Sequence, residues 1–250
     1  MQAVVAGVSV DEKRIAGKVA VVTGASRGIG EAAMHSLLRE GAQVAGIARD
    51  PVALARACAP KDLPAALPIS ADVGHESAVE RAFDGVVERF GRVDILVNSA
   101  GTLTMCSLEH MTLADWESTL RTNLTGVFLC SRAAVRRMLT SEPGPGGLRG
   151  QIVQIVSGAG VRAWVGAGAY TASKFGVMGL SDVLREEVRG RGIRVTDILP
   201  GMVETAMTDR PEFAERVKLE TDDVVQVVLA ALTAAPHAMV KRIDLRNLTV

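Results

Sequence analysis

The feature that most constrains the fold is an alternation between short apolar runs and longer segments with helical periodicity. The apolar runs are rich in Val, Ile and Leu and are nearly continuous, as at positions 19–22 and 152–156. Continuous runs are typical of strands that are covered on both faces, as in parallel sheets. Between them, segments such as 75–90 repeat apolar residues at three- and four-residue intervals and end at a glycine. The pattern indicates strands that alternate with amphipathic helices.

We therefore predict an α/β fold: a Rossmann-type, doubly wound parallel sheet of about seven strands with helices on both faces. Seven strands in 250 residues leave little room for a second domain, so residues 18–250 are expected to form one dinucleotide-binding and catalytic domain. Residues 1–17 are interpreted as an N-terminal extension. Strands are expected at 18–23, 43–48, 66–70, 93–97, 151–156, 193–199 and 240–245, and helices at 31–40, 52–58, 75–90, about 113–139, 170–189 and 222–234.

Composition excludes several other classes of protein. Lys and Arg number 28 and Asp and Glu number 28, so a formal net charge of zero gives no reason to expect a nucleic-acid or acidic-membrane partner. No apolar stretch approaches the length of a membrane span, and the N-terminus lacks the features of a signal peptide. Three cysteines without paired spacing and four isolated histidines argue against a disulfide framework and against a metal site. We expect a cytoplasmic protein.

A glycine-rich turn follows the first predicted strand and precedes a helix. It reads Thr23-Gly24-Ala25-Ser26-Arg27-Gly28-Ile29-Gly30. Glycines allow a backbone to approach a pyrophosphate closely, and a helix N-terminus offers free N–H groups to the anion. A tight strand–helix turn without a ligand is the alternative, but the position of the turn favours dinucleotide binding.

The second strand bears on the choice of nucleotide. A carboxylate at its end would bind an adenosine ribose diol, but the strand ends in Ala48 and is followed by Arg49. With Arg27 in the glycine turn, two guanidinium groups are predicted to bind a 2′-phosphate. The sequence therefore favours NADP(H) over NAD(H). In the alternative interpretation, Arg49 pairs with Asp50 or faces solvent.

A second group of residues suggests acid–base chemistry. Tyr170, the only tyrosine, and Lys174 are four residues apart and share one face of a predicted helix. Ser157 lies thirteen residues earlier, at the end of a predicted strand. A nearby ammonium is expected to lower the pKa of a phenol by favouring the phenolate.

Together these motifs resemble the short-chain dehydrogenase/reductase family from about Gly17 to the C-terminus. The chain is similar to members that act on carrier-bound 3-oxoacyl chains and on 3-hydroxy acids. The residues that carry the resemblance are the glycine turn, Asp72-Val73, Asn98-Ser99-Ala100-Gly101, Asn123, Ser157, Tyr170 with Lys174, and Pro200-Gly201-Met202-Val203-Glu204-Thr205.

The resemblance implies a hydride transfer between a nicotinamide and a ketone, aldehyde or secondary alcohol. It assigns proton transfer to Tyr170 and orientation of the carbonyl oxygen to Ser157. Lys174 would bind the nicotinamide ribose. Asn123 would hold a water that links Lys174 to solvent. The implied cofactor-binding residues are Gly24, Ser26, Arg27, Gly28, Ile29, Gly30, Arg49, Asp72, Val73, Asn98, Ala100, Gly101, Tyr170, Lys174, Pro200, Gly201, Val203 and Thr205.

The substrate itself is left open between 3-oxoacyl and 3-hydroxy acid compounds. Only about twenty residues follow Thr205 before the next predicted helix, so a short lid and an open pocket are expected. Arg162 is either an anion partner or a solvated loop charge, and the second interpretation is favoured. The residues expected to face the pocket are Thr102, Leu103, Met105, Ala159, Val161, Arg162, Trp164, Met202 and Met207.

Two further expectations concern function class and assembly. The alternative function is a non-catalytic, NADP(H)-binding redox sensor of the same fold. The resemblance implies a homotetramer or dimer that packs through the helices holding Asn123 and Tyr170. Apolar surface for that contact is predicted at Val127, Phe128, Ala134, Val135 and Met138.

Overall fold

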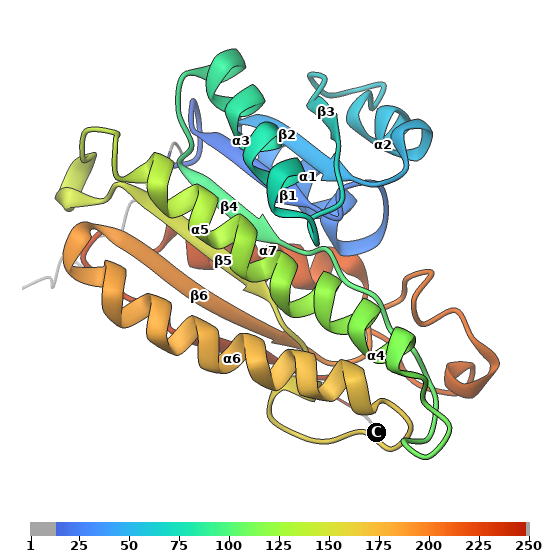
Figure 1. The fold of residues 1–250 in the computed structure, drawn as a ribbon. Coiled ribbons are helices and arrows are strands. Elements are labelled where there is room, and N and C mark those ends of the chain that lie inside the picture. Colours follow the sequence, from blue (N-terminus) through green and yellow to red (C-terminus); the bar gives the residue numbers. More distant parts are fainter. Residues whose placement is uncertain (1–13, 249–250) are drawn as a thin grey trace, which may run out of the picture.

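A single parallel sheet of seven strands forms the centre of the computed structural model, which describes residues 14–248 (Figure 1). The strand order is β3-β2-β1-β4-β5-β6-β7, and every neighbouring pair is parallel. The predicted fold is confirmed. The strands are β1 (Val19–Thr23), β2 (Gln43–Ala48), β3 (Leu67–Ser70), β4 (Ile95–Asn98), β5 (Gly150–Ile155), β6 (Ile193–Pro200) and β7 (Arg242–Leu245).

Helices cover both faces of the sheet, which explains why the central strands are apolar throughout (Figure 1). One apolar core lies under α1, α2 and α7, and a second lies under α3, α5 and the end of α6. The helices are α1 (Gly28–Arg39), α2 (Pro51–Cys58), α3 (Glu76–Phe90), α4 (Leu113–Leu120), α5 (Gly126–Met138), α6 (Gly168–Val188) and α7 (Thr221–Thr233).

The segment predicted as one helix from about 113 to 139 is divided. A π-helical turn, Arg121–Thr125, separates α4 from α5. Gly126 begins α5, and a Cβ there would stand 2.8 Å from Val73 Cγ2, so the helix passes very close to the loop after β3. π-helical turns are often found at functional sites, and this one contains Asn123.

The predicted apolar contact surface on α5 is largely wrong. Val127, Ala134 and Met138 are buried against the sheet, and only Phe128 is exposed, at 42%. Five apolar positions were predicted to face a partner, but the sheet and α3 cover more than one face of this helix.

At the two ends of the chain, the described residues pack against the domain. Arg14 donates a hydrogen bond to the Thr233 carbonyl and Ile15 is buried, while residues 1–13 of the predicted extension lie outside the described part. The Gly/Pro-rich stretch at 143–147 forms the predicted loop between α5 and β5. Across residues 14–248, no helix combines the length and apolarity required to cross a membrane.

Candidate active site

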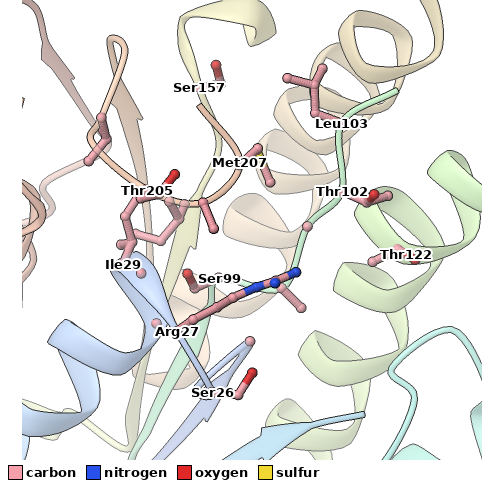
Figure 2. A pocket seen from close by; sticks show the side chains of 18 of the residues that line it. Ser26, Arg27, Ile29, Ser99, Thr102, Leu103, Thr122, Ser157, Thr205 and Met207 are labelled. Atoms are coloured by element: carbon pink, nitrogen blue, oxygen red, sulfur yellow. The ribbon is translucent and has the colours of Figure 1, made fainter. Parts of the chain in front are cut away.

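A cavity of about 550 Å³ opens at the carboxyl ends of the strands, where doubly wound sheets bind their ligands. Figure 2 shows Ser26 and Arg27 at one end of it and Ser157 and Leu103 at the other. All but two of the predicted site residues line this cavity. Those that do are Gly24, Ser26, Arg27, Gly28, Ile29, Gly30, Arg49, Asp72, Val73, Ala100, Gly101, Ser157, Tyr170, Lys174, Pro200, Gly201, Val203 and Thr205.

The glycine turn is built for close backbone approach. A Cβ at Gly24 would stand 2.8 Å from Ala100 Cα, and one at Gly30 would stand 2.3 Å from the Gly24 oxygen. Gly24 and Gly28 also have positive φ angles of 68° and 60°, which favour glycine. Helix α1 begins at Gly28 without a side-chain cap, so its first N–H groups face the cavity. This turn fits a dinucleotide pyrophosphate.

Two unpaired guanidinium groups lie at the nucleotide end. Arg27 and Arg49 are exposed, line the cavity, and form no ion pair with any residue in 14–248. Asp50 does not neutralise Arg49, because its carboxylate caps α2 and accepts hydrogen bonds from the N–H groups of Val52 and Ala53 at 3.0 and 3.1 Å. The arrangement leaves two positive charges beside the end of β2.

The catalytic end joins β5 to α6. Tyr170 and Lys174 lie one turn apart on α6, and Lys174 Nζ is 5.6 Å from the centroid of the Tyr170 ring. Lys174 Nζ also donates a 3.0 Å hydrogen bond to the Ile155 carbonyl, which fixes it against the end of β5. Ser157 follows that strand and hydrogen-bonds to the Tyr170 phenol. Helix and strand thus bring the three predicted residues together.

Burial controls the ionisation of these groups. It raises the pKa of the Tyr170 phenol above its ordinary value, and the hydrogen bond from Ser157 offsets only part of that rise. It lowers the pKa of Lys174 to about 8. The lowering expected from the nearby ammonium is not reached in the protein without ligand, because desolvation of the buried phenol is the larger effect. For the complex with a bound cofactor it stays a prediction.

The side chains of Asn98 and Asn123, the two exceptions, do not line the cavity. Asn98 donates hydrogen bonds to Ser131 and Gln154 beneath the sheet. Asn123 accepts from the Thr102 N–H at 2.8 Å, and donates to the Thr102 carbonyl at 2.9 Å and to Ser173 Oγ at 3.1 Å. The Asn123 amide is therefore occupied by protein groups, and it joins the π-helical turn to α6 and to the loop after β4.

The walls at the catalytic end are mostly apolar, as predicted. Leu103, Trp164, Met202 and Met207 pack in one cluster with Tyr170 and line the cavity. Thr102 lines it as well. Of the other predicted pocket residues, Met105 and Ala159 lie behind the wall, whereas Val161 and Arg162 are exposed outside it.

Several lining residues were missed by the sequence reasoning. Ser99 and Thr122 stand beside motifs that were recognised. Arg210 had no motif to mark it, because it lies in the irregular segment between β6 and α7. Its Nη2 donates a 3.0 Å hydrogen bond to the Leu103 carbonyl, which joins this segment to the loop after β4.

That segment, residues 201–220, forms a short lid whose base is closed by Asn247. The Asn247 side chain accepts a hydrogen bond from Met202 N–H at 3.3 Å and donates to the Val217 carbonyl at 2.9 Å. Thr205, in the lid, lies close enough to the glycine turn that a Cβ on Gly28 would be 3.3 Å from its methyl group. The short lid was predicted, but Asn247 and the Arg210 contact hold it across the cavity.

Comparisons with known proteins agree with this geometry. A model of the short chain dehydrogenase family matches residues 18–215. An uncharacterized oxidoreductase of Staphylococcus epidermidis is 32% identical over 92% of this chain and 96% of its own. The D-threitol dehydrogenase of Mycolicibacterium smegmatis is 44% identical over 78% of this chain and 73% of its own. The crystal structure of a dehydrogenase/reductase from Sinorhizobium meliloti, 30% identical, superposes with a TM-score of 0.82 over 94% of this chain and 96% of that one.

Proposed function

The chain belongs to the short-chain dehydrogenase family of oxidoreductases, and from that premise we propose that it uses NADP(H) to interconvert a carbonyl compound and an alcohol. The substrate is a ketone or aldehyde in one direction and a secondary alcohol, or the corresponding primary alcohol, in the other. The observation that carries the proposal is the meeting of Tyr170, Ser157 and Lys174 in the cavity that also contains the glycine turn.

The residues that would hold the cofactor form a continuous track along the cavity. The glycine turn and the start of α1 would bind the pyrophosphate, and Asp72 with Val73 would face the adenine. Lys174 would bind the nicotinamide ribose, and Thr205 with the backbone of Val203 would bind the carboxamide. When bound, the nicotinamide supplies or accepts the hydride.

The preference for NADP(H) is supported by charge. Arg27 and Arg49 place two guanidinium groups, neither of them ion-paired within residues 14–248, where the adenosine ribose would lie. Guanidinium groups bind phosphate by charge-assisted, bidentate hydrogen bonds. The Oδ1 atom of Asp50, next to Arg49 in the chain, is used as the cap of α2.

Proton transfer is assigned to Tyr170. In reduction, the phenol donates its proton to the carbonyl oxygen as the carbon accepts the hydride; in oxidation, the phenolate takes the alcohol proton. Ser157 holds the same oxygen through its hydroxyl group. Because burial raises the pKa of Tyr170, the phenol stays protonated in the free protein and is ready to act as the acid. Charge on Lys174 favours the phenolate that proton donation leaves behind.

Asn123 has a positioning role in this scheme. Its side chain fixes the Thr102 backbone and Ser173, and Ser173 Oγ donates to the Tyr170 carbonyl at 2.6 Å. The amide thus holds the turn of α6 that presents Tyr170. A water relay from Lys174 would then depend on backbone groups of the π-helical turn, since the Asn123 side chain is already engaged.

The decisive experiment measures oxidation of NADPH with a panel of activated ketones and compares the wild type with Tyr170→Phe. Loss of the phenolic proton donor should lower kcat/KM by about 10²- to 10⁴-fold, while the Kd for NADPH stays close to that of the wild type. An unreactive wild type that still binds NADPH would favour the alternative, a non-catalytic redox sensor. Undiminished turnover by the variant would refute the assignment of Tyr170.

A second substrate class is favoured by one specific observation, the 44% identity to a D-threitol dehydrogenase. In this reading the substrate is a small polyol, oxidised at a secondary alcohol. Adding tetritols with NADP⁺ to the panel separates the two, because a polyol dehydrogenase would reduce NADP⁺ with tetritols and would show little activity with apolar ketones.

We also propose that the chain is a cytoplasmic homo-oligomer, a tetramer or a dimer, as the family resemblance implies. Phe128 on α5 and Phe175 and Val183 on α6 are exposed apolar side chains on neighbouring helices at 42%, 47% and 57%. Burial of such side chains at a contact between copies would remove their apolar area from water. Light scattering would refute the proposal if it gave the mass of a single chain, 26.3 kDa.

A further inference from the structure

The catalytic end of the cavity contains a charged side chain that the proposed mechanism does not use. Arg210 is half-buried and lines the cavity, and within residues 14–248 no carboxylate lies close enough to pair with it. Among the described residues, its guanidinium donates one hydrogen bond, from Nη2 to the Leu103 carbonyl. The remaining N–H donors are available to a ligand.

The backbone holds Arg210 in one place. Pro211 restricts the preceding residue to an extended conformation, and Arg210 has φ −143° and ψ 148°. Three residues further on, Phe213 is buried in the apolar cluster that contains Tyr170. On the other side, Thr208 Oγ1 donates to the Val203 carbonyl at 2.5 Å. These contacts fix the backbone at Arg210, and the hydrogen bond to the Leu103 carbonyl holds its guanidinium at the cavity wall.

The surroundings of Arg210 make an anionic ligand favourable. Leu103, Trp164 and Met207 present apolar surface to the same end of the cavity. A charge beside apolar walls loses hydration, and a ligand of opposite charge offsets that loss. The other two arginines of the cavity, Arg27 and Arg49, are at the opposite, nucleotide end and are assigned to the cofactor.

We propose that Arg210 binds a carboxylate of the substrate, so that the reacting compounds are oxo acids and the matching hydroxy acids. A planar guanidinium fork matches the two oxygens and the single charge of a carboxylate. The apolar walls then enclose the carbon chain between that carboxylate and the carbonyl carbon, whose oxygen meets Tyr170 and Ser157. This inference rests on the proposed function and narrows its substrate class; it also replaces Arg162, which is exposed outside the cavity, as the anion partner.

The test compares pairs of substrates that differ only in charge. Acetoacetate and methyl acetoacetate, and levulinate and methyl levulinate, are reduced with NADPH by the wild type, Arg210→Gln and Arg210→Lys. In the pair whose acid is reduced with the higher kcat/KM, the wild type should prefer the acid over its ester by at least about tenfold in kcat/KM, which corresponds to about 1.4 kcal/mol. Arg210→Gln should abolish the preference by raising KM for the acid. Loss of the contact to Leu103 acts on the acid and the ester alike, so the acid-to-ester ratio of kcat/KM is the readout.

Two controls separate substrate binding from other roles. Arg210→Lys keeps the charge but not the fork, and should recover part of the preference for the acid. Arg162→Gln removes an exposed arginine outside the cavity and should change nothing. Butyrate should inhibit reduction of the ester competitively in the wild type, and this inhibition should be lost in Arg210→Gln.

Several results would overturn the inference. One is a wild type that reduces the esters as well as the acids. Another is loss of the preference for the acid in Arg162→Gln instead of Arg210→Gln. The last is an Arg210→Gln variant in which the Kd for NADPH rises while the acid-to-ester ratio of kcat/KM stays constant. The last result would place Arg210 on the cofactor. A wild type that reduces no carbonyl compound would instead refute the proposed function, and butyrate binding measured by its effect on Tm would then still test the anion site.

Discussion

Reversal of one charge should change the cofactor preference. The change is Arg49→Asp, at the end of β2, where Arg49 is exposed and unpaired within the described residues. A charge-assisted contact to phosphate contributes about 2 kcal/mol in full, and solvent screening at this exposed site reduces it to about 1 kcal/mol. The new carboxylate repels the 2′-phosphate and accepts hydrogen bonds from a ribose diol, and each effect adds about 1 kcal/mol. The sum of about 3 kcal/mol predicts a shift of roughly 10²-fold from NADP(H) toward NAD(H).

The assay is kcat/KM for each reduced nucleotide at a saturating ketone concentration, in the wild type and the variant. The matched control is Arg81→Asp, the same charge reversal at an exposed position on α3 that does not line the cavity. Added salt should reduce the wild-type preference, because it screens exposed charges. The reasoning is refuted if the wild type uses both nucleotides equally, or if Arg81→Asp shifts the ratio as much as Arg49→Asp.

Three further predictions concern packing and ionisation. Gly30→Ala should abolish measurable NADPH binding, because its Cβ would stand 2.3 Å from a backbone oxygen of the turn; Gly85→Ala on α3, with no atom within 4 Å, should leave the Kd unchanged. Arg185→Met should lower the free energy of unfolding by about 3–5 kcal/mol in denaturant titrations, since it leaves Asp197 buried without its 2.6 Å partner, and adding Asp197→Leu should restore most of the loss. The pKa of Lys174 is about 8 in the folded protein, below the ordinary lysine value of 10.5 that holds in the unfolded chain. Between these two pH values the unfolded chain therefore keeps a proton on this amine that the folded protein has lost. Unfolding free energy of the protein without ligand should therefore rise with pH by up to about 1.4 kcal/mol per unit in that window, relative to Lys174→Met, and a flat difference would contradict the burial of the amine.

The fold was predictable because its signals are local and repeated. The apolar run at 19–22 and the glycine at 24 follow one another directly, and every predicted strand is present within a few residues of its expected bounds. The same holds for Tyr170 and Lys174, since a spacing of four residues on a helix fixes their relation whatever surrounds it. Such features need no knowledge of distant contacts.

Other parts of the site depend on contacts between distant segments. Nothing in the sequence near Arg210 distinguishes it from Arg162, yet only Arg210 lines the cavity, because the lid places it against Leu103, 107 residues away. Asn123 was expected to hold a water, but its amide is engaged by Thr102, in the loop after β4, and by Ser173, in α6. Pattern alone does not show which partner satisfies a polar group.

By itself, then, the chain determined the order of strands and helices, the glycine turn and the grouping of Ser157, Tyr170 and Lys174, since periodicity and short spacings act through neighbouring residues. Tertiary structure alone decided the ionisation of Tyr170 and Lys174, the partners that engage the Asn123 amide, and the place of Arg210 over the apolar wall. Burial and polar contacts arise only when segments far apart in sequence meet, and the free energy of a charge depends on what then surrounds it.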